Sequence, residues 1–98
     1  MHARVTSIQV SPDKIEEATR ITRDIIIPAA QREKGFKGYM VLGDRATGKS
    51  LSITFWETAA DMDASGPTSA YYREVMAGIA PLFTAPPVVD NLEVIVQV

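Results

Sequence analysis

The chain has 98 residues, the size of one small domain, which excludes two independent hydrophobic cores. Hydrophobic residues make up 46% of it and charged residues 22%, a globular composition that excludes intrinsic disorder. Ten Lys and Arg against twelve Asp and Glu give a net charge of −2 with no basic cluster, which argues against nucleic acid as a partner. Because the sequence has no Cys, no leader and no apolar run of about 18 residues, we expect one cytoplasmic domain over residues 1–98 without disulfides or membrane contact.

The first predicted element is a strand over residues 2–10, where β-branched residues alternate with small polar ones. A helix follows, because Ser11 is a favoured N-cap and Pro12 a favoured first helical residue. Apolar residues then recur at spacings of three and four, at Ile15, Ala18, Thr22, Ile25, Ile26 and Ala29, which predicts one buried helix face.

This first helix should run to about Lys34 and end at Gly35. Pro28 lies inside it and has no backbone N–H to donate to the carbonyl four residues earlier. We therefore expect a bend or a shortened helix over residues 24–27.

Two further strands are predicted over residues 36–42 and 51–57, joined by turn residues at 43–50. The turn reads GDRATGKS and matches the phosphate-binding pattern G-x-x-x-x-G-K-[ST]. A phosphate-binding loop is followed by a helix, whereas this one is followed by an alternating strand sequence. We therefore interpret the segment as a hairpin turn in which Gly48 has a positive φ.

A second helical region is predicted to begin at Thr58, to be interrupted over residues 65–68 and to resume over 69–79. Its acidic residues 61–66 resemble the start of a calcium loop, but the twelfth position is Tyr72 in place of the bidentate Glu. With one His and no Cys we expect no metal site and no cofactor. A proline-containing loop and a strand over residues 92–98 complete the chain.

The order β-α-β-β-α-β predicts an α+β fold of the ferredoxin-like type, with a four-stranded antiparallel sheet and both helices on one face. The sheet face that carries Trp56 and Tyr39 is not polar, so we expect it to need a cover. A second copy of the chain is the simplest cover, which predicts a homodimer.

The remaining chemistry is aromatic and cationic. Trp56, Tyr39, Tyr71 and Tyr72 could line one cavity with Arg73, and Met76 lies on the same helix face as Tyr72. Flat rings suit a flat aromatic ligand, and a guanidinium can hold a phenolate. His2, at the mobile terminus, is not expected to act as a base.

Several segments resemble the antibiotic biosynthesis monooxygenase domain over most of the chain: Pro28-Ala29-Ala30, Lys34-Gly35-Phe36-x-Gly38, Asp44-x-x-Thr47-Gly48, Ile53-Thr54-Phe55-Trp56-Glu57 and Asp61-Met62. The resemblance implies a dimeric α+β barrel. Its oxygenase members oxidise quinols or polyphenols with O₂ and need no metal or flavin.

The resemblance also implies roles for particular residues. Ser69-Ala70-x-x-Arg73-Glu74 is similar to the segment that carries an active-site Arg, which implies Arg73 as anion stabiliser and Trp56 as a wall against the ring. We expect Tyr72, Tyr71, Tyr39, Ser52 and Met76 to bind the small aromatic substrate. Ser52 and Met62 stand where these members have Asn and Tyr.

Two other interpretations follow from the same resemblance. The haem-degrading branch uses an Asn on the first strand and a His on the second helix, whereas this chain has Thr6 near the first position and no His over residues 71–79. A non-catalytic dimer that binds a small ligand, or serves a structural role, is the alternative to the monooxygenase.

Overall fold

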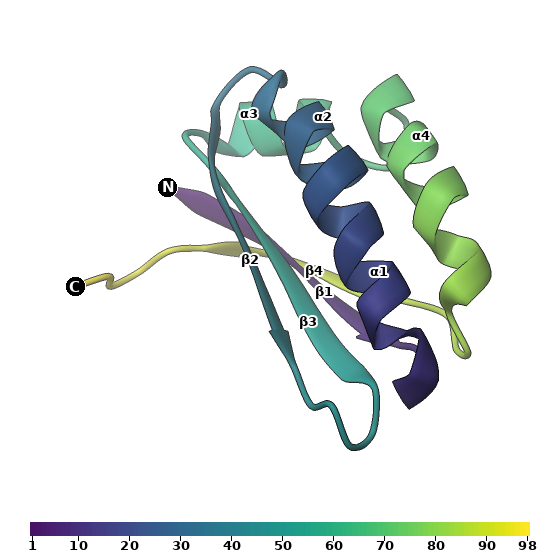
Figure 1. Ribbon diagram of the computed structural model, residues 1–98. Helices are drawn as coiled ribbons and strands as arrows, with labels where there is room; N and C mark the ends of the chain where they lie inside the picture. Colours follow the sequence, from purple (N-terminus) through teal and green to yellow (C-terminus); the bar gives the residue numbers. More distant parts are fainter.

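The computed structural model describes all 98 residues and contains a four-stranded antiparallel sheet with its helices on one face (Figure 1). The strands are β1 (His2–Gln9), β2 (Phe36–Gly43), β3 (Lys49–Trp56) and β4 (Val88–Glu93), in the spatial order β2-β3-β1-β4. β1 pairs with both β3 and β4, and β2 pairs with β3 as a hairpin. The predicted ferredoxin-like α+β subunit is confirmed.

The first helical region is irregular where Pro28 predicts it to be. It consists of η1 (Pro12–Lys14), α1 (Ile15–Ile21), the π-helical η2 (Thr22–Ile26) and α2 (Ile27–Gln31). The wider π turn precedes Pro28 and accommodates its missing N–H. The region ends at Gln31, three residues earlier than predicted, and Gly35 follows with a φ of +81°. The Ser11 side chain makes no capping hydrogen bond.

The β2–β3 turn depends on Gly48, whose φ is +78° as the hairpin interpretation requires. Its carbonyl accepts a hydrogen bond from the Val10 N–H at 3.1 Å, which ties the turn to the end of β1. A Cβ atom at position 48 would overlap the Val10 carbonyl oxygen. Because β3 begins at Lys49, no helix follows the GKS sequence, and the segment is a hairpin turn.

The second helical region consists of α3 (Ala59–Ala64), α4 (Ala70–Ile79) and η3 (Ala80–Leu82). Side-chain oxygens of Thr58 and Ser69 accept hydrogen bonds from the Asp61 and Tyr72 N–H groups, both at 3.0 Å, and so cap α3 and α4. The acidic stretch lies within and just after α3. No helix of the chain has both the length and the apolar character needed to cross a membrane.

The last strand is not where the sequence pattern placed it. β4 covers Val88–Glu93, whereas we predicted a strand over residues 92–98. β4 runs antiparallel to β1 from Ser7 back to His2, so β1 offers no partner beyond its own start. The Val94 N–H still reaches the Met1 carbonyl at 2.9 Å, and the tail then extends beyond the sheet (Figure 1).

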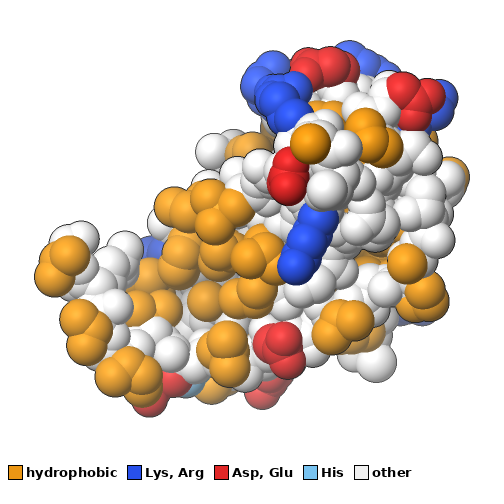
Figure 2. All heavy atoms as spheres, turned by 90° about the horizontal axis from the view of Figure 1, so that it is seen from below, with side chains coloured by type: hydrophobic (Ala, Val, Ile, Leu, Met, Phe, Trp, Pro, Cys, Tyr) orange, Lys and Arg blue, Asp and Glu red, His pale blue; other side chains and the backbone are white.

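The two faces of the sheet have the opposite roles to those expected. Trp56 is fully buried and Tyr39 largely covered, because both lie on the face beneath the helices. The open face carries aliphatic and aromatic side chains in register across β2, β3 and β1: Met40, Leu42, Leu51, Ile53, Phe55 and Val5. Figure 2 shows hydrophobic side chains gathered in one broad area on this side of the molecule.

The apolar core between sheet and helices is small. Its buried cluster consists of Ile21, Ile26 and Ile79, which belong to the first and second helical regions and not to the sheet. The sheet residues below them carry mainly hydroxyl groups, which do not fill the interior. A cavity remains between the two layers.

The cost of a side chain at position 48 can be measured against a matched glycine that has free space around it. Gly48→Ala should lower the free energy of unfolding by about 1–3 kcal/mol, because the new Cβ meets backbone and a positive φ disfavours Ala. Gly78→Ala on exposed α4, where a Cβ would meet nothing within 4 Å, should raise it by about 0.5–1 kcal/mol. Urea denaturation at one protein concentration measures both, and equal effects would contradict the assignment.

Candidate functional site

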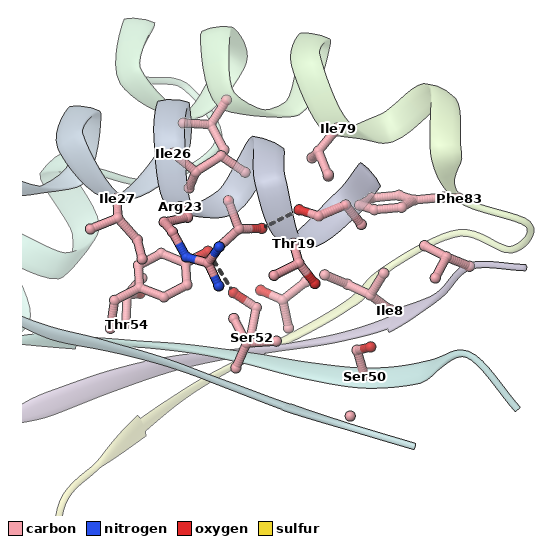
Figure 3. Close-up of a pocket in the computed structure, with 18 of the residues that line it drawn as sticks. Ile8, Thr19, Arg23, Ile26, Ile27, Ser50, Ser52, Thr54, Ile79 and Phe83 are labelled. Carbon is pink, nitrogen blue, oxygen red and sulfur yellow. Dashed lines mark hydrogen bonds between the residues drawn. The ribbon is translucent and has the colours of Figure 1, made fainter. Parts of the chain in front are cut away.

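A cavity of about 470 Å³ lies between the helix-facing side of the sheet and the helices α1, α2 and α4 (Figure 3). This volume is in the range of small-molecule binding sites. Its exposed lining residues belong to β2, the hairpin turn and η2, so the cavity opens at the β2 edge.

The floor of the cavity is hydroxylated. Every second residue of β1 and β3 faces the helices, and these positions include Thr6, Ser50, Ser52 and Thr54. The Tyr39 hydroxyl on β2 shares a hydrogen bond of 2.7 Å with Ser52 Oγ. The floor therefore offers neutral donors and acceptors that can orient a polar ring.

The roof of the cavity is mainly apolar. It is formed by side chains of the two helical regions, including Ile26, Ile27, Val75, Met76 and Ile79. Arg23 extends from η2 over the floor near Ser52 in Figure 3 and is exposed at the opening. A flat ligand would have apolar contact above and hydrogen-bonding groups below.

Five of the residues predicted to bind substrate meet at this cavity. Tyr39, Ser52, Tyr71, Tyr72 and Met76 all line it, although they come from β2, β3 and α4. The topology brings them together because α4 lies across the sheet face to which Tyr39 and Ser52 belong.

Trp56 was predicted to form a wall against the ring; it does not line the cavity, and that role stays a prediction. It lies behind the cavity, with Nε1 donating to Thr54 Oγ1 at 3.0 Å. Its ring meets Tyr71 edge-on at a centroid distance of 6.3 Å and Phe36 at 6.0 Å. Trp56 therefore packs against Tyr71, which lines the cavity.

Arg73, which we predicted to stabilise the anion, also lies outside the cavity, and that role stays a prediction. It is exposed, and its guanidinium donates to the Thr68 and Ser69 carbonyls before α4. Arg73 lies about 100° around the helix from Tyr72 and about 200° from Tyr71, so its side chain points away from the cavity that both tyrosines line. His2 does not line the cavity either.

The buried cation of the cavity is Arg4, which the sequence analysis did not identify. Its side chain is buried, and the residue is 5% exposed at the inner part of β1. Its guanidinium donates to the Met62 carbonyl at 2.6 Å and to the Ser65 carbonyl and Oγ, both at 3.2 Å. The Trp56 and Tyr72 rings lie 5.9 and 5.5 Å from its central carbon.

No carboxylate lies within 4 Å of Arg4, and its Nε has no hydrogen-bond partner. Burial lowers the pKa of this guanidinium, and the neighbouring Tyr71 and Tyr72 oppose that shift. One sequence signal pointed to it: Arg4 shares the side of β1 that carries Ile8 and Val10, an inward face on which a charge is rare.

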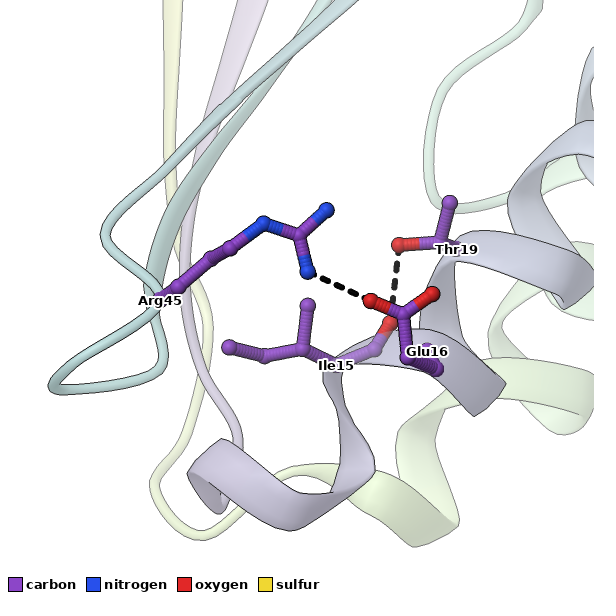
Figure 4. Close-up of polar contacts among 4 residues, drawn as sticks. All are labelled: Ile15, Glu16, Thr19 and Arg45. Atoms are coloured by element: carbon purple, nitrogen blue, oxygen red, sulfur yellow. Dashed lines mark hydrogen bonds and ion pairs between the residues drawn. The ribbon is translucent and has the colours of Figure 1, made fainter.

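The opening of the cavity carries an ion pair between two elements. Arg45 of the hairpin turn contacts Glu16 near the start of α1 (Figure 4). Both side chains are more than 70% exposed, so the pair contributes little to stability. It spans the hairpin side of the opening.

Burial favours the neutral form of two tyrosines of the cavity, because it raises the pKa of both Tyr71 and Tyr39. Burial raises the pKa of Tyr71 to about 12, against the opposing effect of Arg4. Burial also raises the pKa of Tyr39, and its hydrogen bond with Ser52 opposes the shift. No group of three or more His, Cys, Asp or Glu side chains is arranged to hold a metal ion.

This arrangement can be compared with known proteins. Residues 1–77 match the sequence model of the antibiotic biosynthesis monooxygenase family. The chain belongs to this family. Among curated relatives, the uncharacterized protein Rv2557 of Mycobacterium tuberculosis is 32% identical over 94 residues, which are 96% of this chain and 41% of that protein. The chain thus spans less than half the length of this relative.

Solved structures of the same fold have lower identity. A Bordetella bronchiseptica protein that carries the family's name has a TM-score of 0.79 at 21% identity, over 97% of both chains. A mutant of MhuD with two manganese protoporphyrin IX molecules per active site has a TM-score of 0.79 at 19% identity, over 100% of this chain and 98% of that one. At these identities the likeness establishes the fold.

The raised pKa of Tyr71 predicts a pH effect on stability. In the unfolded chain Tyr ionises near pH 10, so between about pH 10 and 12 the folded state holds the proton more tightly. The contribution of Tyr71 to the free energy of unfolding should be constant below that window and should fall as pH rises through it. Urea midpoints should show a smaller fall for Tyr71→Phe than for the wild type, and parallel curves would contradict the assignment.

Proposed function

We propose that this antibiotic biosynthesis monooxygenase domain oxidises a small aromatic, a quinol or polyphenol, with O₂ and without a cofactor. The observation that supports the proposal is the cavity, which combines three tyrosines, a hydroxylated floor and the buried cation Arg4. Such a site binds a ring, favours its anion and excludes bulk water.

The reaction proceeds from the ionised phenol. The phenolate gives one electron to O₂, and the resulting pair recombines to form a C–O bond at a ring carbon. The O–O bond of this peroxide then breaks as the ring carbon loses its proton, which releases hydroxide and leaves a quinone. Arg4 stabilises the phenolate, while Tyr39 and Ser52 hydrogen-bond to the ring oxygens.

A second candidate is a non-catalytic module of the same fold that binds a small ligand. It is favoured by the lack of a strong internal base: the one carboxylate that lines the cavity is Asp44, at the opening. Asp44 accepts a hydrogen bond from the Ala46 N–H at 2.9 Å, which holds it in the turn. The two candidates differ in one measurement, since only the enzyme consumes O₂ when the ligand is bound.

We also propose that the protein is a homodimer joined through the open face of the sheet. This face exposes about half of the surface of three large apolar residues, Met40, Leu42 and Leu92. A contiguous exposed apolar patch of this kind marks an interaction surface. Ile95, Val96 and Val98 belong to the tail that extends beyond the sheet, and they are more exposed still. A second copy, placed face to face, buries both surfaces by one symmetric contact.

The cavity proposal is tested by filling the floor. Thr6→Phe should reduce O₂ consumption with a panel of quinols by at least about tenfold, because the larger ring occupies the ligand's place. Thr6→Val keeps the shape of Thr6 and should retain most of the activity. If wild type consumes no O₂ above the buffer rate while quinols bind, the binding module is the correct function.

The dimer is tested with two apolar residues of similar exposure. Met40→Glu on the open face, where Met40 is 48% exposed, should give a monomer in sedimentation experiments at micromolar concentration. Ile25→Glu on the outer side of the helices, where Ile25 is 53% exposed, should leave the dimer intact. A wild-type protein that sediments as a monomer contradicts the proposal.

A further inference from the structure

We infer that the cavity selects ligands that carry a negative charge on an oxygen, as a carboxylate or an ionised phenol, and that Arg4 determines this selectivity. The inference rests on the proposed use of the cavity as a binding site and does not depend on oxidation. It concerns the charge of the ligand and the residue of this chain that selects it.

The first argument is the unbalanced charge of Arg4. A guanidinium has five N–H donors, and the partners of Arg4 are the Met62 and Ser65 carbonyls and the Ser65 hydroxyl. These groups are dipoles at the end of α3 and carry no net charge. A buried cation that has hydrogen bonds but no counter-ion keeps a positive potential in its surroundings.

The second argument concerns every other ionisable group near Arg4. Tyr71 and Tyr72 of α4 and Asp63 of α3 act on it electrostatically, and Thr54 of β3 faces it across the sheet without a charge. Burial raises the pKa of Tyr71 to about 12, so this phenol carries no charge at physiological pH. Asp63 forms no ion pair with Arg4, so no element around the guanidinium neutralises it.

The third argument is the contrast between the cavity and the whole chain. The chain has a net charge of −2, yet the cavity is lined by Arg4, Arg23 and Arg45 against one carboxylate, Asp44. Arg45 is paired with Glu16, which leaves Arg4 inside and Arg23 at the opening without an acidic partner. The positive potential is therefore a local property of the cavity.

The magnitude of the effect makes it measurable. An opposite charge within about 4–6 Å lowers the pKa of an acid by roughly 1–3 units, because the anion is favoured. The same interaction should favour a bound carboxylate over a neutral amide of equal shape by tenfold or more.

Arg4 also holds α3 against β1, so loss of binding in a variant could reflect loss of structure. The primary test therefore uses the wild-type protein and varies the ligand. Calorimetry compares 2-naphthoate with 2-naphthamide, which share one ring system and differ in charge. The absorbance of 4-nitrophenol, titrated from pH 5 to 9 with and without excess protein, reports the ionised-phenol arm.

Wild type should bind 2-naphthoate at least about tenfold more tightly than 2-naphthamide, and the bound nitrophenol should ionise about one pH unit lower than the free one. A response in one arm alone assigns the anion to that class. Arg4→Gln should abolish the preference, and Arg4→Lys, which keeps the charge, should retain part of it. Arg20→Gln, which removes an exposed charge of α1 outside the cavity, should change nothing.

Equal affinity for the two naphthalenes together with an unshifted nitrophenol titration, or binding of neither probe class, would overturn the inference. So would an unchanged preference in folded Arg4→Gln, as judged by its circular dichroism. Anion preference without O₂ consumption supports the inference and removes the proposed oxidation. O₂ consumption with equal use of neutral and anionic rings supports the proposed oxidation and overturns the inference.

Discussion

The alternation of side chains along the strands is the constraint on which the rest of the structure depends. Successive residues of β1 and β3 point to opposite faces, so each strand carries two independent patterns. On β3 the side beneath the helices carries the small hydroxyl residues Ser50, Ser52 and Thr54, which leave space unfilled. The opposite side of β3 carries Leu51, Ile53 and Phe55 and faces outward. The cavity and the open face therefore have a common origin in which pattern the helices cover.

This arrangement reverses the usual division, in which the helix-covered face of a sheet is the more apolar one. The helices and the sheet pack against each other less closely here, and the space between them is a cavity lined in part by the charged side chain of Arg4. Ile21, Ile26 and Ile79 supply a small core near the roof. The remaining apolar surface lies on the far side of the sheet, which links the two proposals made for the molecule.

The sequence predicted the element order, the hairpin turn at Gly48 and the irregular helix before Pro28, because each depends on local backbone chemistry. It did not predict which sheet face the helices cover, since strand alternation defines two faces without ranking them. The last strand was misplaced because its pairing is set by β1, nearly ninety residues away. Arg73 was preferred to Arg4 because the resemblance supplied a motif for Arg73, whereas the only sequence signal for Arg4 was its place on the same side of β1 as Ile8 and Val10.

The attachment of Arg4 has a consequence for how such a domain can diverge. The guanidinium that gives the cavity its charge also closes the carbonyl end of α3 through Met62 and Ser65. A lineage that changed ligand by replacing this residue would have to rebuild the α3–α4 connection in the same step. The Thr6 and Ser50 hydroxyls of the floor hold no other element in place, so these are the positions at which substitutions that suit a new ligand cost the fold least.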